Sequence, residues 1–306
     1  MKLFLIGNSF SYYWTDELYK LLAAAGDEDA VVCNIYYSGC TFDMHLNWWE
    51  NGDAPYTVLI HDKNGRTVIK NATFETGISY ADWDKIGLQQ SGRYIYHSGA
   101  ELHDEMIRNH LPELYSRVHA RFPDAEYYWQ QNWTHELGNA GRGMRSPERQ
   151  EEIYRGFRDV GLKYCEQFGL TNVPCGDAWR SIRHDPMFYA PANDDVSYPF
   201  RTLHTRIGTA KFKDYPFIYN EDLSHDGDIG GGQYLNAAVW FEILTHKSVI
   251  GNSYIPTYTH ETAGITFTFT EKRIAALQNA AHSAVLDAYG EEWYNDQDNK
   301  GGHFTY

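Results

Sequence analysis

The first ten residues constrain the fold more than any other segment of the chain. Residues 2–6, Lys-Leu-Phe-Leu-Ile, form a short apolar run that ends abruptly in Gly7-Asn8-Ser9. A polar stretch with helical spacing follows, so the pattern predicts a buried strand, a tight turn and a helix start. Because α/β sheets place their chemistry at the carboxyl ends of strands, Ser9 lies where a nucleophile can act if a base is supplied from elsewhere. A structural role fits the same residues, because Ser and Asn are common helix N-caps.

The rest of the chain alternates apolar runs with amphipathic helical segments. Further strands are predicted at residues 30–37, 83–90 and 126–131. Helices are predicted at residues 16–25, 44–49, 102–122 (where Pro112 is a possible break), 146–168, 233–244 and 270–289. This alternation is typical of a mainly parallel sheet with helices on both faces. We therefore predict an α/β fold, a three-layer α/β/α sandwich, in a single domain that spans residues 1–306.

Two segments depart from that alternation. In residues 56–72, two strand-like runs flank Lys63-Asn64-Gly65-Arg66. Asn-Gly is the strongest short-range hairpin signal, so an inserted β-hairpin is predicted there. Residues 184–224 are rich in Pro, Asp, Asn and Tyr and have weak periodicity. They predict a long, loop-rich excursion, and long loops in compact domains are usually functional or disordered.

The charge balance argues against polyanionic partners. The chain has 26 Lys and Arg against 41 Asp and Glu, a net charge of −15. Nucleic acid and anionic membrane surfaces are therefore not expected to bind. No apolar run approaches 18 residues, so no membrane-spanning helix is predicted, and residues 2–6 are too short for a signal peptide. The chain is expected to be soluble, and either cytoplasmic or exported after removal of a signal.

No motif for a metal or a cofactor is present in the sequence. The four cysteines form no Cys-x-x-Cys pair, and the histidines form no His-Glu-x-x-His pair. No phosphate-binding glycine motif follows the first strand. We therefore expect neither a cofactor nor a resident metal.

A base for Ser9 is suggested by one short motif, Asp222-Leu-Ser-His225. Its spacing lets both side chains project from one turn, so that the carboxylate can accept the imidazole N–H. The motif follows the long excursion and precedes the helix predicted at 233–244, which places it at a rim of the sheet. A hydrated turn is one alternative. A cation-binding loop that includes Asp226 and Asp228 is another.

These motifs, taken in order, resemble those of the SGNH (GDSL-like) hydrolases. Residues 7–11 read Gly-Asn-Ser-Phe-Ser, a glycine turn follows the second strand, and Asp-x-x-His precedes a late helix. The closer resemblance is to a bacterial subgroup that also carries Trp-Asp-x-x-x-Leu-Gln-Gln, here residues 83–90, and a late Asp-Gly helix entry. The resemblance extends from residue 3 to about residue 250, and it implies a flavodoxin-like sandwich.

The resemblance also implies roles for single residues. Ser9 matches the nucleophile, and the backbone N–H groups of Ser9 and Gly39 match two donors of the oxyanion hole. The third donor in the family is an Asn side chain in a Gly-x-Asn-Asp block. This chain has no such block, and the side chain of Gln90 is the preferred substitute, with Gln89 and Ser91 as alternatives.

The last block of the family supplies the acid and the base. Asp222 and His225 match it, which completes a Ser9-His225-Asp222 triad. A competing alignment on Asp226 would put Ile229 where the His belongs, and the protein would then be inactive or built differently from the family.

The activity that the resemblance implies is ester hydrolysis through an acyl-enzyme, on O-acetyl esters of carbohydrates. The substrate would be a small-molecule or carbohydrate ester. Candidate substrate contacts are Asn132, Trp133 and Arg201, with His135 as a further polar group. The alternative is a degenerate member that binds carbohydrate without hydrolysis, because Asn8 replaces the family's usual Asp and the third block is missing. The sequence predicts neither the acyl group nor the oligomeric state.

Overall fold

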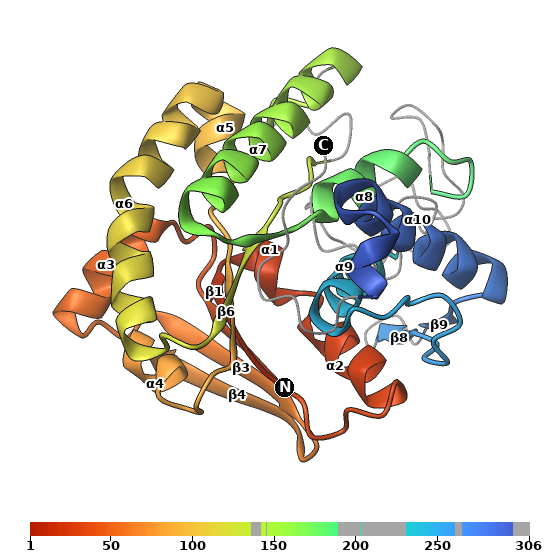
Figure 1. The fold of residues 1–306 in the computed structure, drawn as a ribbon, viewed down its shortest axis with the longest axis horizontal. Helices are drawn as coiled ribbons and strands as arrows, with labels where there is room; N and C mark the ends of the chain where they lie inside the picture. Colours follow the sequence, from red (N-terminus) through yellow and green to blue (C-terminus); the bar gives the residue numbers. More distant parts are fainter. Residues whose placement is uncertain (136–141, 145, 189–202, 204–230, 261–264, 296–306) are drawn as a thin grey trace.

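A seven-stranded sheet forms the centre of the molecule, with strand order β4-β3-β2-β1-β5-β6-β7 (Figure 1). The computed structural model describes residues 1–135, 142–144, 146–188, 203, 231–260 and 265–295. Strands β1, β2, β5, β6 and β7 are parallel, and β3 and β4 are antiparallel to their neighbours. The strands are β1 Lys2–Gly7, β2 Val31–Tyr36, β3 Tyr56–Asp62, β4 Gly65–Ala72, β5 Lys85–Leu88, β6 Glu126–Gln130 and β7 Thr171–Val173.

Helices cover both faces of this sheet (Figure 1). The longer helices are α2 Thr15–Ala24, α3 Phe42–Asn51, α6 Ala100–Arg121, α7 Pro147–Phe168, α9 Gly232–Thr245 and α10 Glu271–Tyr289. The shorter ones are α1 Ser9–Tyr12, α4 Phe74–Ile78, α5 Arg93–Ser98, α8 Cys175–Ile182 and the 3₁₀ helix η2 Glu291–Tyr294. A separate two-stranded sheet pairs β8 Thr257–His260 with β9 Ile265–Thr268.

The sheet separates two clusters of buried apolar side chains, one on each face, and strand β1 contributes to both. Leu3 and Leu5 pack in the cluster that contains side chains of α2, α8, α9 and α10. Phe4 and Ile6 pack on the opposite face, with side chains of α3, α4, α6 and α7. All four are buried, which explains why this strand reads as a continuous apolar run. The predicted three-layer α/β/α sandwich with a mainly parallel sheet is confirmed.

The predicted hairpin is also confirmed. Strands β3 and β4 pair from Tyr56 to Ala72, and Asp62 lies opposite Gly65 at the turn. Gly65 has φ +107°, which favours glycine at that position. The hairpin extends the sheet antiparallel to β2, and most residues of β4 are exposed at the sheet edge.

The remaining predicted elements agree closely in extent, but one expectation within α6 is wrong and several short elements have no predicted counterpart. Helix α6 is continuous through Pro112, so the possible break at that residue does not occur. The short elements without a predicted counterpart are α4, α5, α8, η2, β7, β8 and β9. Most of the excursion predicted at 184–224 lies outside the described residues.

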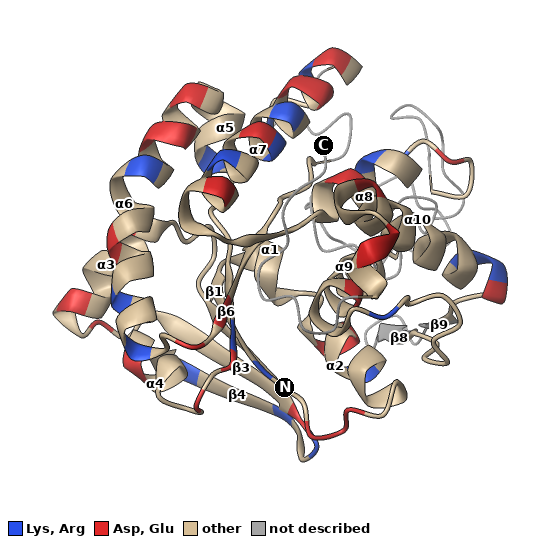
Figure 2. Ribbon diagram, viewed as in Figure 1, with Lys and Arg blue, Asp and Glu red and all other residues tan. Residues whose placement is uncertain are grey.

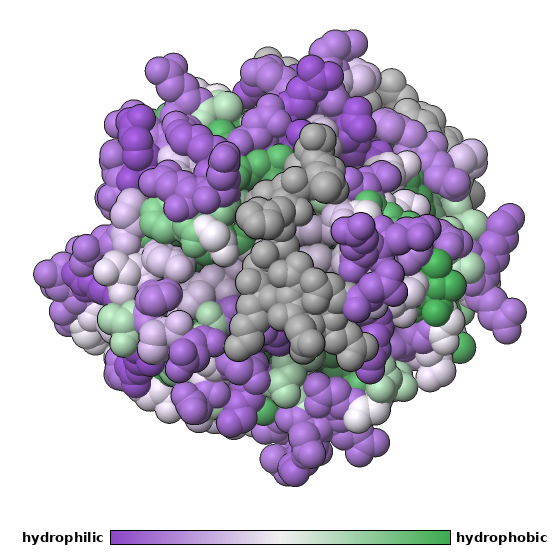
Figure 3. All heavy atoms as spheres, in the orientation of Figure 1, coloured by the Kyte–Doolittle hydropathy of each residue, from purple (hydrophilic) through white to green (hydrophobic). Residues whose placement is uncertain are grey.

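The surface is strongly polar. Both acidic and basic residues lie along α6 and α7 (Figure 2), and hydrophilic side chains cover most of the face shown in Figure 3. In the part of the chain that the structure describes, no helix is both long and apolar enough to cross a membrane.

Candidate active site

The turn that carries Ser9 is held by Asn8. The Asn8 side-chain oxygen caps α1 by accepting a hydrogen bond from the N–H of Phe10 at 3.0 Å. Its Nδ2 donates to the carbonyl of Cys40, and its backbone N–H donates to Gln89 Oε1, both at 3.0 Å. Asn8 therefore fixes this turn to the segments that follow β2 and β5. The helix cap is Asn8, so the Ser9 hydroxyl is not used for capping.

Ser9 lines a cavity of about 290 Å³ beyond the carboxyl ends of β1, β2 and β5. The Ser9 residue is only 8% exposed. The described residues that line the cavity are Asn8, Ser9, Phe10, Tyr13, Ser38, Gly39, Ser91, Gly92, Arg93, Tyr96, His135 and Arg142.

Two backbone donors are available in this cavity. Within the described ranges, the N–H groups of Ser9 and Gly39 make no hydrogen bond. Gly39 has φ +65°, a left-handed conformation that favours glycine. An oxyanion that forms next to Ser9 would need such preorganised donors.

The three residues considered as substitutes for the missing third block, Gln89, Gln90 and Ser91, are all buried. Gln90 is 1% exposed, and its Oε1 accepts hydrogen bonds from the N–H groups of Phe42 at 3.0 Å and Ser91 at 3.2 Å. Its Nε2 is buried and has no partner among the described residues. Gln89 Nε2 donates to the carbonyl of Gln90. Of these three candidates, only Ser91 lines the described part of the cavity.

Two of the predicted substrate contacts, Asn132 and Trp133, pack against other parts of the protein. Asn132 Nδ2 donates to the carbonyl of Gln90 at 2.7 Å, so this side chain supports the third block. Trp133 packs between Phe10 and Trp179, with ring centroids 4.6 and 4.9 Å away. Neither Asn132 nor Trp133 lines the described part of the cavity, and their contact with substrate stays a prediction.

Of the other predicted residues, only His135 is among those that the structure describes. His135 does line the cavity. Arg201, Asp222 and His225 lie outside the described residues, as do the competing positions Asp226 and Ile229.

His45 is a positioning residue that the sequence did not single out. Its Nε2 lies 3.2 Å from the carbonyl oxygen of Gly7, and its Nδ1 lies 3.0 Å from the Tyr56 hydroxyl. Burial lowers the pKa of His45 to about 4, so the ring is neutral near pH 7. The neutral tautomer with a proton on Nε2 donates to Gly7 and accepts from Tyr56. His45 thereby anchors the end of β1, two residues before Ser9.

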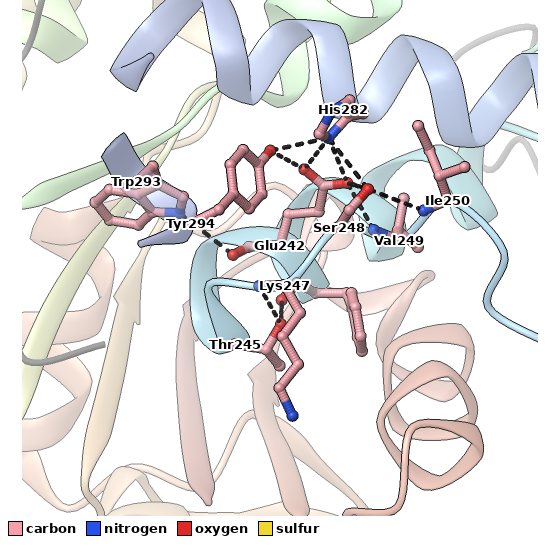
Figure 4. Close-up of polar contacts among 10 residues, drawn as sticks. Glu242, Thr245, Lys247, Ser248, Val249, Ile250, His282, Trp293 and Tyr294 are labelled. Atoms are coloured by element: carbon pink, nitrogen blue, oxygen red, sulfur yellow. Dashed lines mark hydrogen bonds and ion pairs between the residues drawn. The ribbon is translucent and has the colours of Figure 1, made fainter. Parts of the chain in front are cut away.

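A cluster of Ser248, His282 and Glu242 lies between α9 and α10, away from Ser9 (Figure 4). Glu242 is fully buried and accepts from the N–H of Val249 at 2.7 Å and from the Tyr294 hydroxyl. His282 Nδ1 lies 3.1 Å from Glu242 Oε2 and 3.3 Å from Ser248 Oγ. A catalytic triad needs the acid and the nucleophile on opposite ring nitrogens, whereas both meet Nδ1 here. This cluster therefore ties α9, α10 and η2 together.

The described residues show no group of three or more side chains suited to a metal ion. All four cysteines are free and buried.

Comparisons with known proteins give one family and a shared fold. The family described as a domain of unknown function (DUF4886) matches residues 2–187. The crystal structure of a DUF4886 family protein from Bacteroides uniformis is 23% identical, with a TM-score of 0.69, and the match covers 98% of this chain and 97% of that one. This likeness shows the same fold over nearly the whole chain.

Two solved structures of lower similarity were provisionally described as hydrolases. One, from Slackia heliotrinireducens and described as an SGNH hydrolase, is 14% identical with a TM-score of 0.47, covering 80% of this chain and 98% of that one. The other, from Parabacteroides merdae and described as a GDSL-like lipase, is 13% identical with a TM-score of 0.45, covering 79% and 94%. Among curated proteins, none matches this chain. Because the family match spans more than half of the 306 residues, the chain belongs to the DUF4886 family.

Proposed function

We propose that this protein is a serine esterase that cleaves O-acetyl esters of carbohydrates through Ser9. One observation carries the proposal. The Ser9 residue and the backbone N–H groups of Ser9 and Gly39, which have no partner in the described part of the chain, share one cavity. An acyl-transfer site needs this combination of a nucleophile and oxyanion donors within reach of one carbonyl group.

His225 and Asp222 are the base and the orienting acid in this proposal. Support comes from the start of α9, seven residues after His225 in the sequence. A Cβ on Gly232 would lie 2.3 Å from Trp179, so the start of this helix packs tightly on that ring. Trp179 stacks on Trp133, which contacts Phe10, the neighbour of Ser9. Shortly after the motif, the chain therefore packs on the aromatic cluster that contacts the neighbour of Ser9.

The proposed reaction has two steps. His225 accepts the proton of Ser9 Oγ as this oxygen bonds to the carbonyl carbon of the ester. The oxyanion accepts hydrogen bonds from the N–H groups of Ser9 and Gly39, the bond to the alcohol breaks, and His225 protonates the leaving alcohol. Water then attacks the acyl-enzyme by the same route and releases the acid.

Hydrolysis of p-nitrophenyl acetate tests this proposal. Ser9→Ala and His225→Ala should lower kcat by about 10⁴-fold or more, since the members of such a triad act as a unit. Ser38→Ala removes another hydroxyl from the same cavity and should retain activity, as should Asp226→Ala. A fluorophosphonate probe should label Ser9 in the wild type.

Two results would contradict the proposal. Wild-type turnover equal to that of Ser9→Ala would remove Ser9 as the nucleophile. Binding of acetylated sugars with no hydrolysis and no labelling would favour a carbohydrate-binding protein instead.

A further inference from the structure

The described residues that line the cavity carry charge of the opposite sign to the net charge of the whole chain. The chain has a net charge of −15, yet the described residues that line the cavity include no Asp or Glu. They do include two arginines, Arg93 and Arg142, together with His135. A cation at a solvent-accessible site in such an acidic protein creates a local field that favours an anionic ligand.

Arg93 has no acidic partner within the described ranges. It is exposed, and its guanidinium Nη1 lies 4.0 Å from Met44 Sδ. Asp43, one residue before Met44 on α3, instead accepts a hydrogen bond from the hydroxyl of Tyr94 at 3.5 Å. Other arginines of the described chain do form ion pairs with carboxylates: Arg117, Arg121, Arg149, Arg155, Arg158 and Arg180.

The backbone holds Arg93 firmly at the edge of the cavity. Its N–H donates to Ser91 Oγ at 3.4 Å, at the start of α5. A Cβ on Gly92 would lie 2.6 Å from Tyr96 and 2.8 Å from Phe157, so the chain is packed against both rings at this point. The guanidinium is thus attached to a fixed backbone position in the cavity that Ser9 also lines.

We propose that the substrate carries a carboxylate near the scissile ester and that Arg93 binds this carboxylate. This inference rests on the proposed esterase function and specifies its substrate class as O-acetylated uronic acids. The guanidinium group presents parallel N–H donors that match the two oxygens of a carboxylate, which gives orientation as well as affinity. Arg93 is a specificity residue in this proposal, because it binds a group that takes no part in the acyl transfer.

A pair of substrates isolates the carboxylate. The O-acetyl esters of methyl glucuronide and methyl glucoside, acetylated at the same ring hydroxyl, differ only at C6, which is a carboxylate in the first and a hydroxymethyl group in the second. We expect the wild type to release acetate from the glucuronide with a kcat/KM at least tenfold higher. Arg93→Gln should lower the ratio of the two kcat/KM values by tenfold or more, and Arg93→Lys should restore part of it. Arg66→Gln, which removes an exposed arginine outside this cavity, is the matched control and should leave the ratio unchanged.

The outcomes separate this inference from the function on which it rests. A wild-type ratio near one, or the same ratio in Arg93→Gln, overturns the role of Arg93. Cleavage of p-nitrophenyl acetate without cleavage of either sugar ester overturns it as well. A chain that cleaves none of the three esters fails the proposed function itself, which the p-nitrophenyl acetate assay reports independently.

Discussion

Substituting Asn8 by Asp tests whether the amide at this position holds the serine turn. Asn8 uses both halves of its amide, since the oxygen accepts from Phe10 and Nδ2 donates to the carbonyl of Cys40. In the Asn8→Asp variant a carboxylate oxygen keeps the first bond but faces the Cys40 carbonyl oxygen at about the same 3.0 Å. Only a protonated carboxyl group can donate there.

The expected loss of unfolding free energy follows from the burial of the new carboxyl group and from the loss of the Nδ2 donor. Asn8 is 1% exposed, and full burial raises the pKa of a carboxyl group by up to about 3–5 units. The cap hydrogen bond from Phe10 favours the charged form, so we expect a rise of about 2–3 units. At about 1.4 kcal/mol per unit, the variant should lose about 3–4 kcal/mol of unfolding free energy at pH 8.

The stability of the Asn8→Asp variant relative to the wild type should depend on pH. The folded variant holds its proton at pH values where the unfolded chain, with a pKa of about 3.9, has released it. Stability relative to the wild type should therefore fall as pH rises from about 4 to about 6–7, and then level off. Below that window the protonated variant should approach wild-type stability.

Urea unfolding between pH 4 and pH 8 measures this difference. Asn51→Asp is the matched control, because Asn51 Nδ2 also donates a hydrogen bond, to Asn47, but at the exposed end of α3. The reasoning is refuted if the two variants lose the same free energy at every pH.

Two further substitutions probe other parts of the structure. Glu242→Ala should cost about 3 kcal/mol or more in urea unfolding, because it leaves the N–H of Val249 and the hydroxyl of Tyr294 without their acceptor; Glu242→Gln should cost less, and equal losses would contradict this account. Gly7→Ala would place a Cβ 2.6 Å from Gln89 Oε1, which accepts the hydrogen bond from the N–H of Asn8. We expect the unfolding free energy to fall by about 1–3 kcal/mol and ester hydrolysis to be reduced. If neither value changes, the Gln89 side chain moves aside freely and this reasoning is wrong.

The sequence predicted the layers of the fold because its strongest signals are local. Leu3 to Ile6 are buried on both faces of the sheet, and the Asn64-Gly65 turn has a distinctive backbone requirement. Helix α8 was missed because Gly176 weakens its helical pattern. That glycine is required by a distant contact, since a Cβ there would lie 2.5 Å from the carbonyl oxygen of Asn132.

The opposite error concerns Pro112 in α6. Proline costs about 3 kcal/mol inside a helix. Here Leu111 and Leu114 are fully buried in the core beside it, which offsets that cost and keeps the helix continuous.

Only the site residues that directly follow a predicted parallel strand could be placed from the sequence. Ser9 and Gly39 follow the first two strands, so the parallel topology brings them to one edge. The partners of Asn8 and His45 could not be predicted, because they are single side-chain hydrogen bonds between segments far apart in the chain.

The hydrogen bonds around Ser9 make the site a product of the complete fold. Asn8 is bonded to residues 32 and 81 positions away, and the carbonyl of Phe10 accepts from Gln130, 120 positions away. Each of these contacts closes a long loop, whose entropy is lost before the bond forms. No contiguous fragment that lacks β6 can retain this arrangement. The turn that holds Ser9 should therefore become ordered late in refolding, in step with the last strands to join the sheet, and the proposed esterase activity would then report on folding cooperativity.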